Sequence, residues 1–204
     1  MNASRREFFA RLGRGVFRVT VAGGLVYGVS SWFRGPGQPR ALEKRLTGIL
    51  RPPGALAERQ FLAACIRCDL CSEVCDTQCI RIFGIWEGRL AGTPHIVADV
   101  KACNLCLACT LVCPSGALKP LRDKKDVAMG VALVDERLCV SHNGTGACGA
   151  CHTACPLRNH AITQGMRNAP TVHADACVGC GQCEEVCIVD DRKAIRVVTG
   201  RSWA

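Results

Sequence analysis

The chain has 204 residues, and its 26 lysines and arginines exceed its 17 aspartates and glutamates, giving a formal net charge of +9. Residues 1–59 hold eleven of the basic and three of the acidic residues, whereas the remainder holds fifteen and fourteen. The excess charge therefore belongs to one terminal segment, which argues against a nucleic-acid-binding surface on the rest of the chain.

The first residues form a pattern typical of an export signal. Ser4 to Phe9 reads SRREFF, in which two arginines follow a polar residue and precede an apolar pair, as in twin-arginine signals. The apolar stretch at residues 19–33 is short for a membrane-spanning helix but suits the apolar region of a signal. We therefore expect residues 1–34 to be a twin-arginine signal or a membrane anchor, and residues 35–59 to be a linker.

Sixteen of the 17 cysteines fall into four blocks of four. Blocks 1, 2 and 4 read C-x2-C-x2-C-x3-C, and block 3 has eight residues between its first two cysteines. Three thiolates on such a loop can share one cubane cluster, and sixteen ligands suffice for four 4Fe-4S clusters. We predict that all sixteen bind cluster iron: Cys65, Cys68, Cys71 and Cys75 in block 1; Cys103, Cys106, Cys109 and Cys113 in block 2; Cys139, Cys148, Cys151 and Cys155 in block 3; Cys177, Cys180, Cys183 and Cys187 in block 4.

The fourth cysteine of a block ligates the cluster of a partner block in two-cluster ferredoxins, so the blocks are expected to work in pairs. Similar linker lengths allow adjacent pairing, block 1 with 2 and block 3 with 4, or nested pairing, block 2 with 3 and block 1 with 4. Pro114 and Pro156 follow the fourth cysteine of blocks 2 and 3, which makes the inner blocks alike and favours nested pairing.

Three other uses of cysteine compete with this interpretation. Disulfides do not require one spacing four times over, and zinc would leave the third cysteine of each run without a role. Cys148 to His152 forms the C-x-x-C-H signature of c-type haem attachment. A haem would leave Cys139 and Cys155 unused, although both stand where the repeat requires a cysteine. Iron–sulfur clusters account for more of the pattern than any of the three.

Cys79 stands outside the four blocks. A small residue and an apolar one follow each of the other blocks, as Ala117-Leu118, Ala161-Ile162 and Ala194-Ile195, and Cys79-Ile80 takes that place after block 1. We therefore expect Cys79 to be a small buried residue that replaces alanine, and we exclude it from the ligands.

The repeats also predict the fold. The repeating unit is a strand, a cluster loop, a short helix and a second strand, so we expect an α+β fold of ferredoxin-like half-units around four clusters over residues 60–199, with a tail at 200–204. Few aromatic residues lie in this domain, so metal binding and folding should be coupled and the apo form largely unfolded. The expected elements before blocks 1 to 4 are a helix at Ala55–Ala64 and strands at Ile96–Val100, Val131–Val134 and Thr171–Ala174.

Motifs for substrate turnover are missing from the sequence. It contains no G-x-G-x-x-G between a strand and a helix, no P-loop, no nucleophile elbow and no H-E-x-x-H, and its five histidines stand singly. We therefore expect an electron-transfer subunit without a substrate site of its own. With four clusters bound, the negative charge of the sixteen cysteine thiolates would exceed the positive charge of the cluster cores, about +2 each. The chain after residue 59 would then carry a net charge of roughly −7.

The chain resembles the NapG/MauM family of ferredoxin-type proteins, which belong to periplasmic nitrate reductase and methylamine utilisation systems. The resemblance covers nearly the whole chain. It is carried by the SRREFF leader, RPPGAL to FLAACIRCDLC at residues 51–71, CNLCLACTLVCPSGAL at residues 103–118, the widened block 3 ending in HTACP, and DACVGCGQCEEVC at residues 175–187. A more distant resemblance, to iron–sulfur subunits of the dimethyl-sulfoxide-reductase type, also favours nested pairing.

The family resemblance implies a polyferredoxin that the twin-arginine route exports to the periplasm, where it can be tethered to the inner membrane. Its expected partners are a membrane-bound quinol-oxidising or ferredoxin-type protein and a periplasmic redox enzyme or cytochrome. A maturation factor for a periplasmic redox enzyme is the alternative. The plain spacing of block 2 departs from the nitrate branch and favours a methylamine-type or unassigned branch.

Overall fold

The computed structural model describes residues 48–190 and 192–199, which belong to one compact unit. The predicted signal at residues 1–34, the first part of the predicted linker and the predicted tail lie outside these residues. Among the helices that the structure describes, none combines the length and the hydropathy needed to cross a bilayer.

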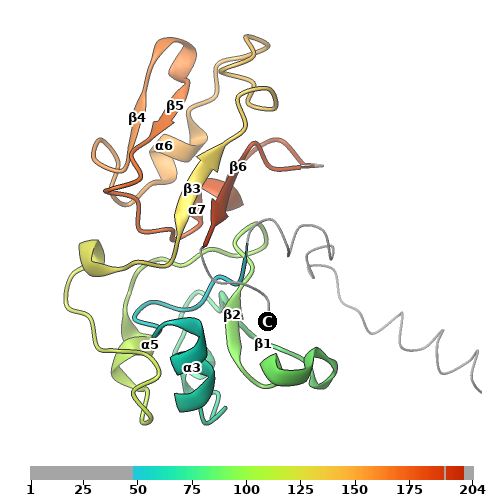
Figure 1. Ribbon diagram of the computed structural model, residues 1–204. Coiled ribbons are helices and arrows are strands. Elements are labelled where there is room, and N and C mark those ends of the chain that lie inside the picture. The colour runs from blue at the N-terminus through green and yellow to red at the C-terminus, as the bar shows by residue number, and fades with distance from the viewer. Residues whose placement is uncertain (1–47, 191, 200–204) are drawn as a thin grey trace, which may run out of the picture. The chain divides into compact units, whose positions relative to one another are not determined.

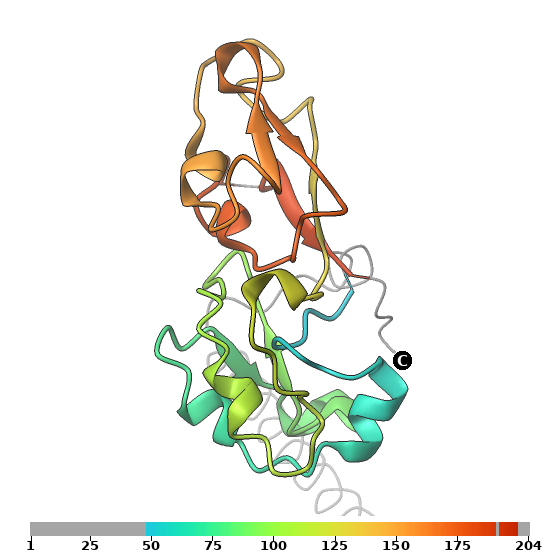
Figure 2. The ribbon, with the colours of Figure 1, turned by 90° about the vertical axis from the view of Figure 1, so that its left-hand side faces the viewer.

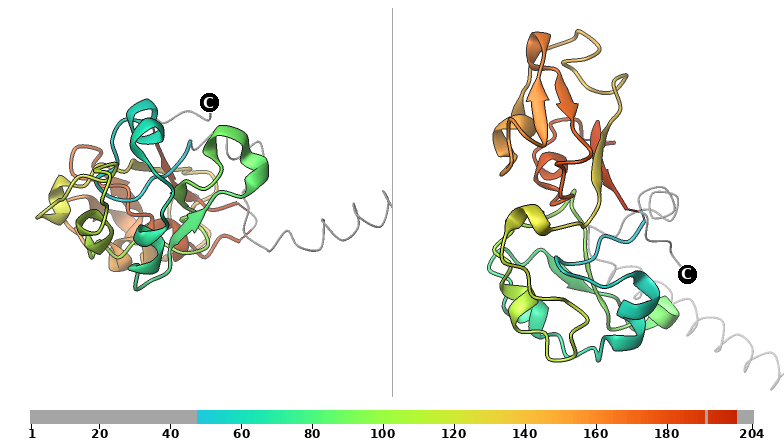
Figure 3. Two further views of the ribbon diagram at one scale, coloured as in Figure 1. Left: turned by 90° about the horizontal axis from the view of Figure 1, so that it is seen from below. Right: turned by 60° about the vertical axis from the view of Figure 1, so that its left-hand side comes forward.

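Residues 48–129, here called the N-terminal module, hold blocks 1 and 2. Ile80 of β1 lies opposite Ile96 of β2 in an antiparallel hairpin, which can be followed beside α3 in Figures 1 and 3. This hairpin carries the chain from block 1 back toward block 2. The elements are α3 (Glu58–Ala64), α4 (Leu70–Glu73), β1 (Ile80–Ile82), η1 (Ile85–Leu90), β2 (Pro94–Ile96), α5 (Ala108–Leu111) and η2 (Lys124–Asp126).

Residues 130–199, the C-terminal module, hold blocks 3 and 4. Strands β3 and β6 pair in an antiparallel sheet, as do β4 and β5, while α6 and α7 contact each other (Figures 1 and 2). The last strand thus pairs with the first, and both cysteine blocks lie between them in the sequence. The elements are β3 (Val131–Val134), α6 (Ala150–Ala154), β4 (Ile162–Gln164), η3 (Met166–Asn168), β5 (Pro170–Val172), α7 (Gln182–Glu185) and β6 (Ile195–Val198).

The predicted strands are found to different degrees. β3 has the predicted bounds, and β5 (Pro170–Val172) overlaps the strand predicted at Thr171–Ala174. The strand predicted at Ile96–Val100 is wrong except at Ile96, where β2 ends, because the Val97 carbonyl accepts hydrogen bonds from Val100 and Lys101 and closes a turn. The helix before block 1 begins only at Glu58. Ala55 instead forms an antiparallel bridge with Leu118, which supplies the extended segment that block 1 otherwise lacks.

The packed body begins before the predicted boundary at residue 60. Ile49, Leu50 and Arg51 are buried, and the Ile96 N–H donates to the Leu50 carbonyl at 2.8 Å. Residues from Ile49 onward therefore belong to the folded N-terminal module and not to a free linker.

Cysteines make up a large share of the principal core. Phe61 is its one aromatic member among the described residues, and the other buried members are aliphatic residues and cysteines. Six cysteines are fully part of this core, namely Cys75, Cys79, Cys103, Cys109, Cys151 and Cys180. The interior therefore depends on groups that can also bind metal, as the sequence predicts.

The N-terminal module is also held together by Arg51, whose side chain is fully buried. Its Nε donates to Glu58 Oε2 at 3.1 Å, and its Nη1 donates to Thr93 Oγ1 at 2.9 Å. The guanidinium carbon lies 4.6 Å from the centre of the Phe61 ring, a cation–π geometry. Arg51 thus joins α3 to the end of the β1–β2 hairpin.

Replacing Arg51 by methionine should strongly destabilise the protein. The substitution leaves the Glu58 carboxylate, whose side chain is only 13% exposed, without its cation, and breaking such a pair costs about 3–5 kcal/mol. The check is the midpoint of urea unfolding, measured by circular dichroism on the loaded full-length protein. The exposed neighbour Arg59→Met is the matched control, and an equally small change in both variants would contradict the structural role of Arg51.

Candidate metal centre

The cysteine loops share an unusual backbone conformation. In blocks 1 and 2 the residues on both sides of the second cysteine have positive φ angles, 60° and 65° at Arg67 and Asp69, and 60° and 63° at Leu105 and Leu107. Non-glycine residues rarely adopt this conformation, and such strain concentrates at functional sites. Successive turns of this kind also direct backbone N–H groups into one concavity, which favours anionic ligands such as thiolates.

Block 3 reaches a similar arrangement by a longer route. Its eight intervening residues form a loop in which Gly146 N–H donates to the Val140 carbonyl at 2.9 Å. The Cys148 N–H then donates to Ser141 Oγ, also at 2.9 Å. Gly149, with φ of 87°, begins α6 directly after the second cysteine, as Asp69 and Leu107 begin α4 and α5.

One pocket of the C-terminal module is lined by cysteines of two blocks. Cys139, Cys148 and Cys151 of block 3 face it together with Cys187, the fourth cysteine of block 4. Apolar side chains form much of the remaining wall, among them Val134, Ile188 and Ile195. Cys148 and Cys151, the pair in the haem-like signature, are thus part of a four-cysteine site. The adjacent His152 lies with its Nε2 2.9 Å from Asn159 Oδ1.

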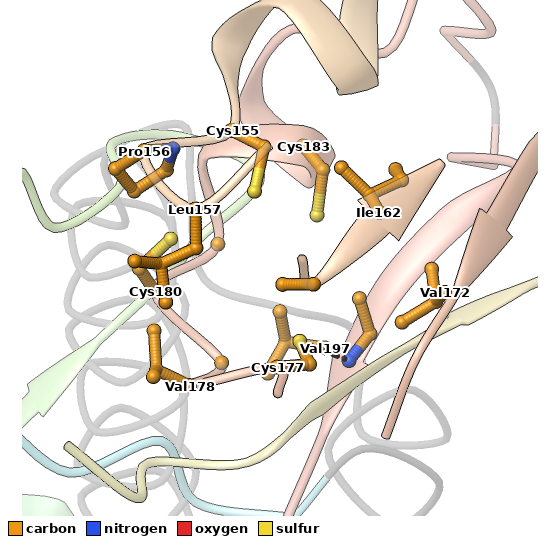
Figure 4. Close-up of a pocket in the computed structure, with 14 residues that line it drawn as sticks. Cys155, Pro156, Leu157, Ile162, Val172, Cys177, Val178, Cys180, Cys183 and Val197 are labelled. Carbon is orange, nitrogen blue, oxygen red and sulfur yellow. Dashed lines mark hydrogen bonds between the residues drawn. The ribbon is translucent and has the colours of Figure 1, made fainter. Parts of the chain in front are cut away.

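In a second pocket the roles of the two blocks are reversed, so that block 4 supplies three cysteines and block 3 supplies one. Cys177, Cys180 and Cys183 of block 4 line it together with Cys155, the fourth cysteine of block 3. Figure 4 shows the sulfur atoms of Cys155, Cys180 and Cys183 facing a common space. Its walls are also apolar and include Leu157, Ile162 and Val197.

In the N-terminal module, the cysteines of blocks 1 and 2 lie close enough to influence one another's pKa. Burial, followed by the nearby charges of Cys106, Cys71 and Cys75, raises the pKa of Cys109 to about 12. Burial and the charges of Cys65, Asp69 and Cys68 raise the pKa of Cys71 to about 12. Cys75, the fourth cysteine of block 1, is thus close to Cys106 and Cys109 of block 2, while Cys71 is close both to its own block and to Cys109.

The structure pairs adjacent blocks, so the nested pairing that Pro114 and Pro156 favoured is wrong. Helix α4 packs against α5, and α6 packs against α7. The β1–β2 hairpin returns the chain from block 1 to block 2, and the β4–β5 hairpin returns it from block 3 to block 4. The two prolines affect only the local conformation of the chain after the fourth cysteine. They do not indicate which other block a block pairs with.

Cys79 is buried, with 2% of its surface exposed, and so are its counterparts Ala117, Ala161 and Ala194. The prediction that it occupies the place of a buried alanine is confirmed. The structure adds that its Sγ lies 3.6 Å from Cys75 Sγ. A hydrogen bond to Cys103 and burial raise the pKa of Cys79 well above its ordinary value, which keeps the thiol protonated beside the two predicted ligands.

The pockets suit a cationic metal–sulfur core. Burial raises the pKa of Cys151 and of Cys180 to about 11, so four thiolates in one apolar pocket require positive charge among them. Backbone N–H groups also point at ligand sulfurs: Leu105 donates to Cys103, Leu118 to Cys113 and Ala132 to Cys177, each at 3.4 Å. Such hydrogen bonds stabilise thiolates and tune cluster potentials.

The described cysteines do not form a site for a single metal ion. Over residues 48–190 and 192–199, no three side chains of His, Cys, Asp or Glu converge closely enough to hold one metal ion. A cubane cluster takes one thiolate for each iron, so its four sulfurs surround a core and do not meet at one point.

Comparison with known protein families supports the binding of iron–sulfur clusters. Residues 64–117 match the 4Fe-4S dicluster domain, and residues 170–190 match the 4Fe-4S binding domain. The dicluster match spans blocks 1 and 2 together, in agreement with their adjacent pairing in the structure. The chain is thus an iron–sulfur protein with ferredoxin domains.

Several relatives resemble the chain over most of its length, although no solved structure matches it. The ferredoxin-type protein NapG of Escherichia coli is 40% identical over 169 residues, which cover 76% of this chain and 72% of that protein. The methylamine utilization ferredoxin-type protein MauM of Methylorubrum extorquens is 42% identical over 73% of this chain and 72% of its own. MauM of Methylobacillus flagellatus is 38% identical over 95% of this chain and 83% of its own. The chain therefore belongs to the NapG/MauM family of ferredoxin-type proteins.

Proposed function

We propose that the chain holds four 4Fe-4S clusters and relays electrons through them. The observation that carries this proposal is the exchange of the fourth cysteine between adjacent blocks, seen in the two pockets of the C-terminal module. We number each site by the block that supplies three ligands. The ligand sets are Cys65, Cys68, Cys71 and Cys113 at site 1; Cys103, Cys106, Cys109 and Cys75 at site 2; Cys139, Cys148, Cys151 and Cys187 at site 3; and Cys177, Cys180, Cys183 and Cys155 at site 4.

Site 1 is completed by Cys113 by analogy with the other three sites. Cys75 lies close to Cys106 and Cys109, and we assign it to site 2. Block 1 then supplies only three ligands to its own site. Cys113 is the remaining fourth cysteine of the pair and lies just beyond α5, which packs on α4.

The protein would position the cluster ligands, stabilise their charge and limit the access of water. Bound clusters would supply one-electron redox chemistry. The loops fix three sulfurs, the partner block fixes the fourth, and the backbone N–H groups of Leu105, Leu118 and Ala132 stabilise negative charge on sulfur. Apolar walls surround the sulfurs of the two C-terminal pockets, whereas Cys68 and Cys106 in the N-terminal module are exposed. The related NapG and MauM proteins are named as ferredoxin-type, and an electron carrier of this kind needs no substrate site of its own.

The donor and acceptor follow from the relatives and from the leader. We propose a membrane-bound quinol-oxidising or ferredoxin-type partner on one side and a periplasmic redox enzyme or cytochrome on the other, with export through the twin-arginine leader SRREFF. A deletion strain tests this: the periplasmic enzyme should be present and loaded with its own cofactor but starved of electrons. An immature enzyme would favour an assembly role instead.

Anaerobically purified protein should contain about sixteen iron and sixteen sulfide per chain, with broad absorbance at roughly 400 nm. Cys79→Ala should keep the full iron content, because Cys79 is not a ligand, whereas Cys68→Ala should lose about four iron. The measurement is iron and sulfide analysis against protein concentration. A sharp Soret band, stoichiometric zinc, or equal iron loss in both variants would contradict the assignment.

Cluster loading should weaken as the pH falls. Burial raises the pKa of Cys151 and Cys180 in the metal-free protein, so these thiols hold their protons at neutral pH and release them when iron binds. Reconstitution should therefore release protons, and a chelator should strip the clusters faster in acid than in alkali. Chelator kinetics followed by the loss of visible absorbance check this, and a rate that does not change with pH would contradict it.

A further inference from the structure

The two modules meet at ligand residues of two different sites. The backbone N–H of Cys103, in block 2, donates to the carbonyl of Cys180, in block 4, at 3.0 Å. Both cysteines belong to the proposed ligand sets, so this inference rests on the proposed function. From the sulfur of Cys103 to the sulfur of Cys180 the path consists of two cysteine residues and one hydrogen bond.

Two side chains of α7 reinforce this junction. Gln182 Nε2 donates to the Cys103 carbonyl at 3.0 Å, so both backbone groups of Cys103 are bonded to block 4. Glu185 accepts the Ala102 N–H at 2.8 Å and the Lys101 ammonium at 3.0 Å. The segment that leads into block 2 is thereby fixed against α7, beside which it runs in Figure 2.

A glycine lets the two backbones approach at this place. Block 4 has Gly179 and Gly181 at its two left-handed positions, where blocks 1 and 2 carry larger residues. A Cβ on Gly181 would lie 2.5 Å from Ala98 Cβ in the N-terminal module, whereas one on Gly179 would lie 2.4 Å from the backbone of Gly130 in its own module. The left-handed turn alone does not demand glycine, since other residues adopt it in blocks 1 and 2. Close contact with the N-terminal module does demand it at Gly181.

We infer that electrons cross between the modules at Cys103 and Cys180, which sets the order of the sites as 1, 2, 4, 3. The order along the electron path therefore differs from the order along the sequence. A second backbone–backbone hydrogen bond between the modules also ends on block 4, from the Met129 N–H to the Val178 carbonyl at 3.1 Å. Sites 1 and 3 are then the ends of the path, where the external donor and acceptor proteins exchange electrons.

The crossing step is a simple one-electron exchange. Site 2 loses one electron and site 4 gains it, or the reverse, and no bond is made or broken and no proton moves. The hydrogen bond that Gln182 donates and those that Glu185 accepts position the two loops and take no part in the redox change.

Two double variants of the full chain distinguish the proposed order of sites, 1, 2, 4, 3, from their order along the sequence. Each variant keeps two intact sites. Cys68→Ala with Cys148→Ala removes one ligand from each of sites 1 and 3 and leaves the inner sites 2 and 4. Cys106→Ala with Cys180→Ala does the same to sites 2 and 4 and leaves the end sites. Each variant should retain about eight iron. Electron paramagnetic resonance of the fully reduced proteins should show magnetic interaction in the first and two isolated spectra in the second.

Isolated spectra in the variant that keeps sites 2 and 4, or interaction in the variant that keeps sites 1 and 3, would overturn the order. A wild-type protein without iron–sulfur clusters would instead overturn the proposed function, so the two failures are distinguishable.

A third variant tests electron transfer across the junction if the double variants do not fold. Gln182→Leu with Glu185→Gln changes no ligand, so it should keep the wild-type iron content while slowing electron equilibration between the modules after rapid partial reduction. The matched control is Gln60→Leu with Glu136→Gln, at exposed positions away from the junction. Equal rates in this variant and its control would contradict the role of the junction.

Discussion

A loop as short as C-x2-C-x2-C can turn three thiols toward one pocket, but its fourth cysteine, beyond the next short helix, points away. In the proposed sites, each block is completed only by the fourth cysteine of a second block. In the C-terminal module this exchange is visible twice, with Cys187 in one pocket and Cys155 in the other. The helix pairs α4–α5 and α6–α7 and the short hairpins between blocks hold the exchanged geometry.

The same constraint explains the composition of the interior. Cysteines occupy positions that aliphatic or aromatic residues fill in other small domains, and Phe61 is the one aromatic in the described part of the principal core. Buried thiols in apolar pockets have raised pKa values, so the metal-free protein would keep them neutral and loosely packed. Bound cores would replace those protons and fill the pockets, which couples metal binding to folding.

Local sequence signals predicted local features well. The four spacings indicated the cysteine blocks, and the comparison of Cys79 with three alanines predicted its burial, because both depend on neighbours within a few residues. The pairing of blocks was not predictable in this way, since linkers of similar length permit either arrangement and Pro114 reports only on its own turn. The buried Arg51 and the Cys103–Cys180 hydrogen bond depend on residues far apart in the chain. No sequence signal singled out the junction, because the glycine that faces it, Gly181, has a counterpart in Gly149 of block 3.

The proposed electron path joins two dicluster modules through their inner sites. Its direct test is anomalous diffraction at the iron edge from anaerobic crystals of the loaded protein. We expect four iron centres, each bounded by three cysteines of one block and the fourth of its neighbour, with the centres at Cys103 and Cys180 lying between the other two. Iron bound by Cys75 together with Cys65, Cys68 and Cys71 would contradict the exchange of ligands between blocks.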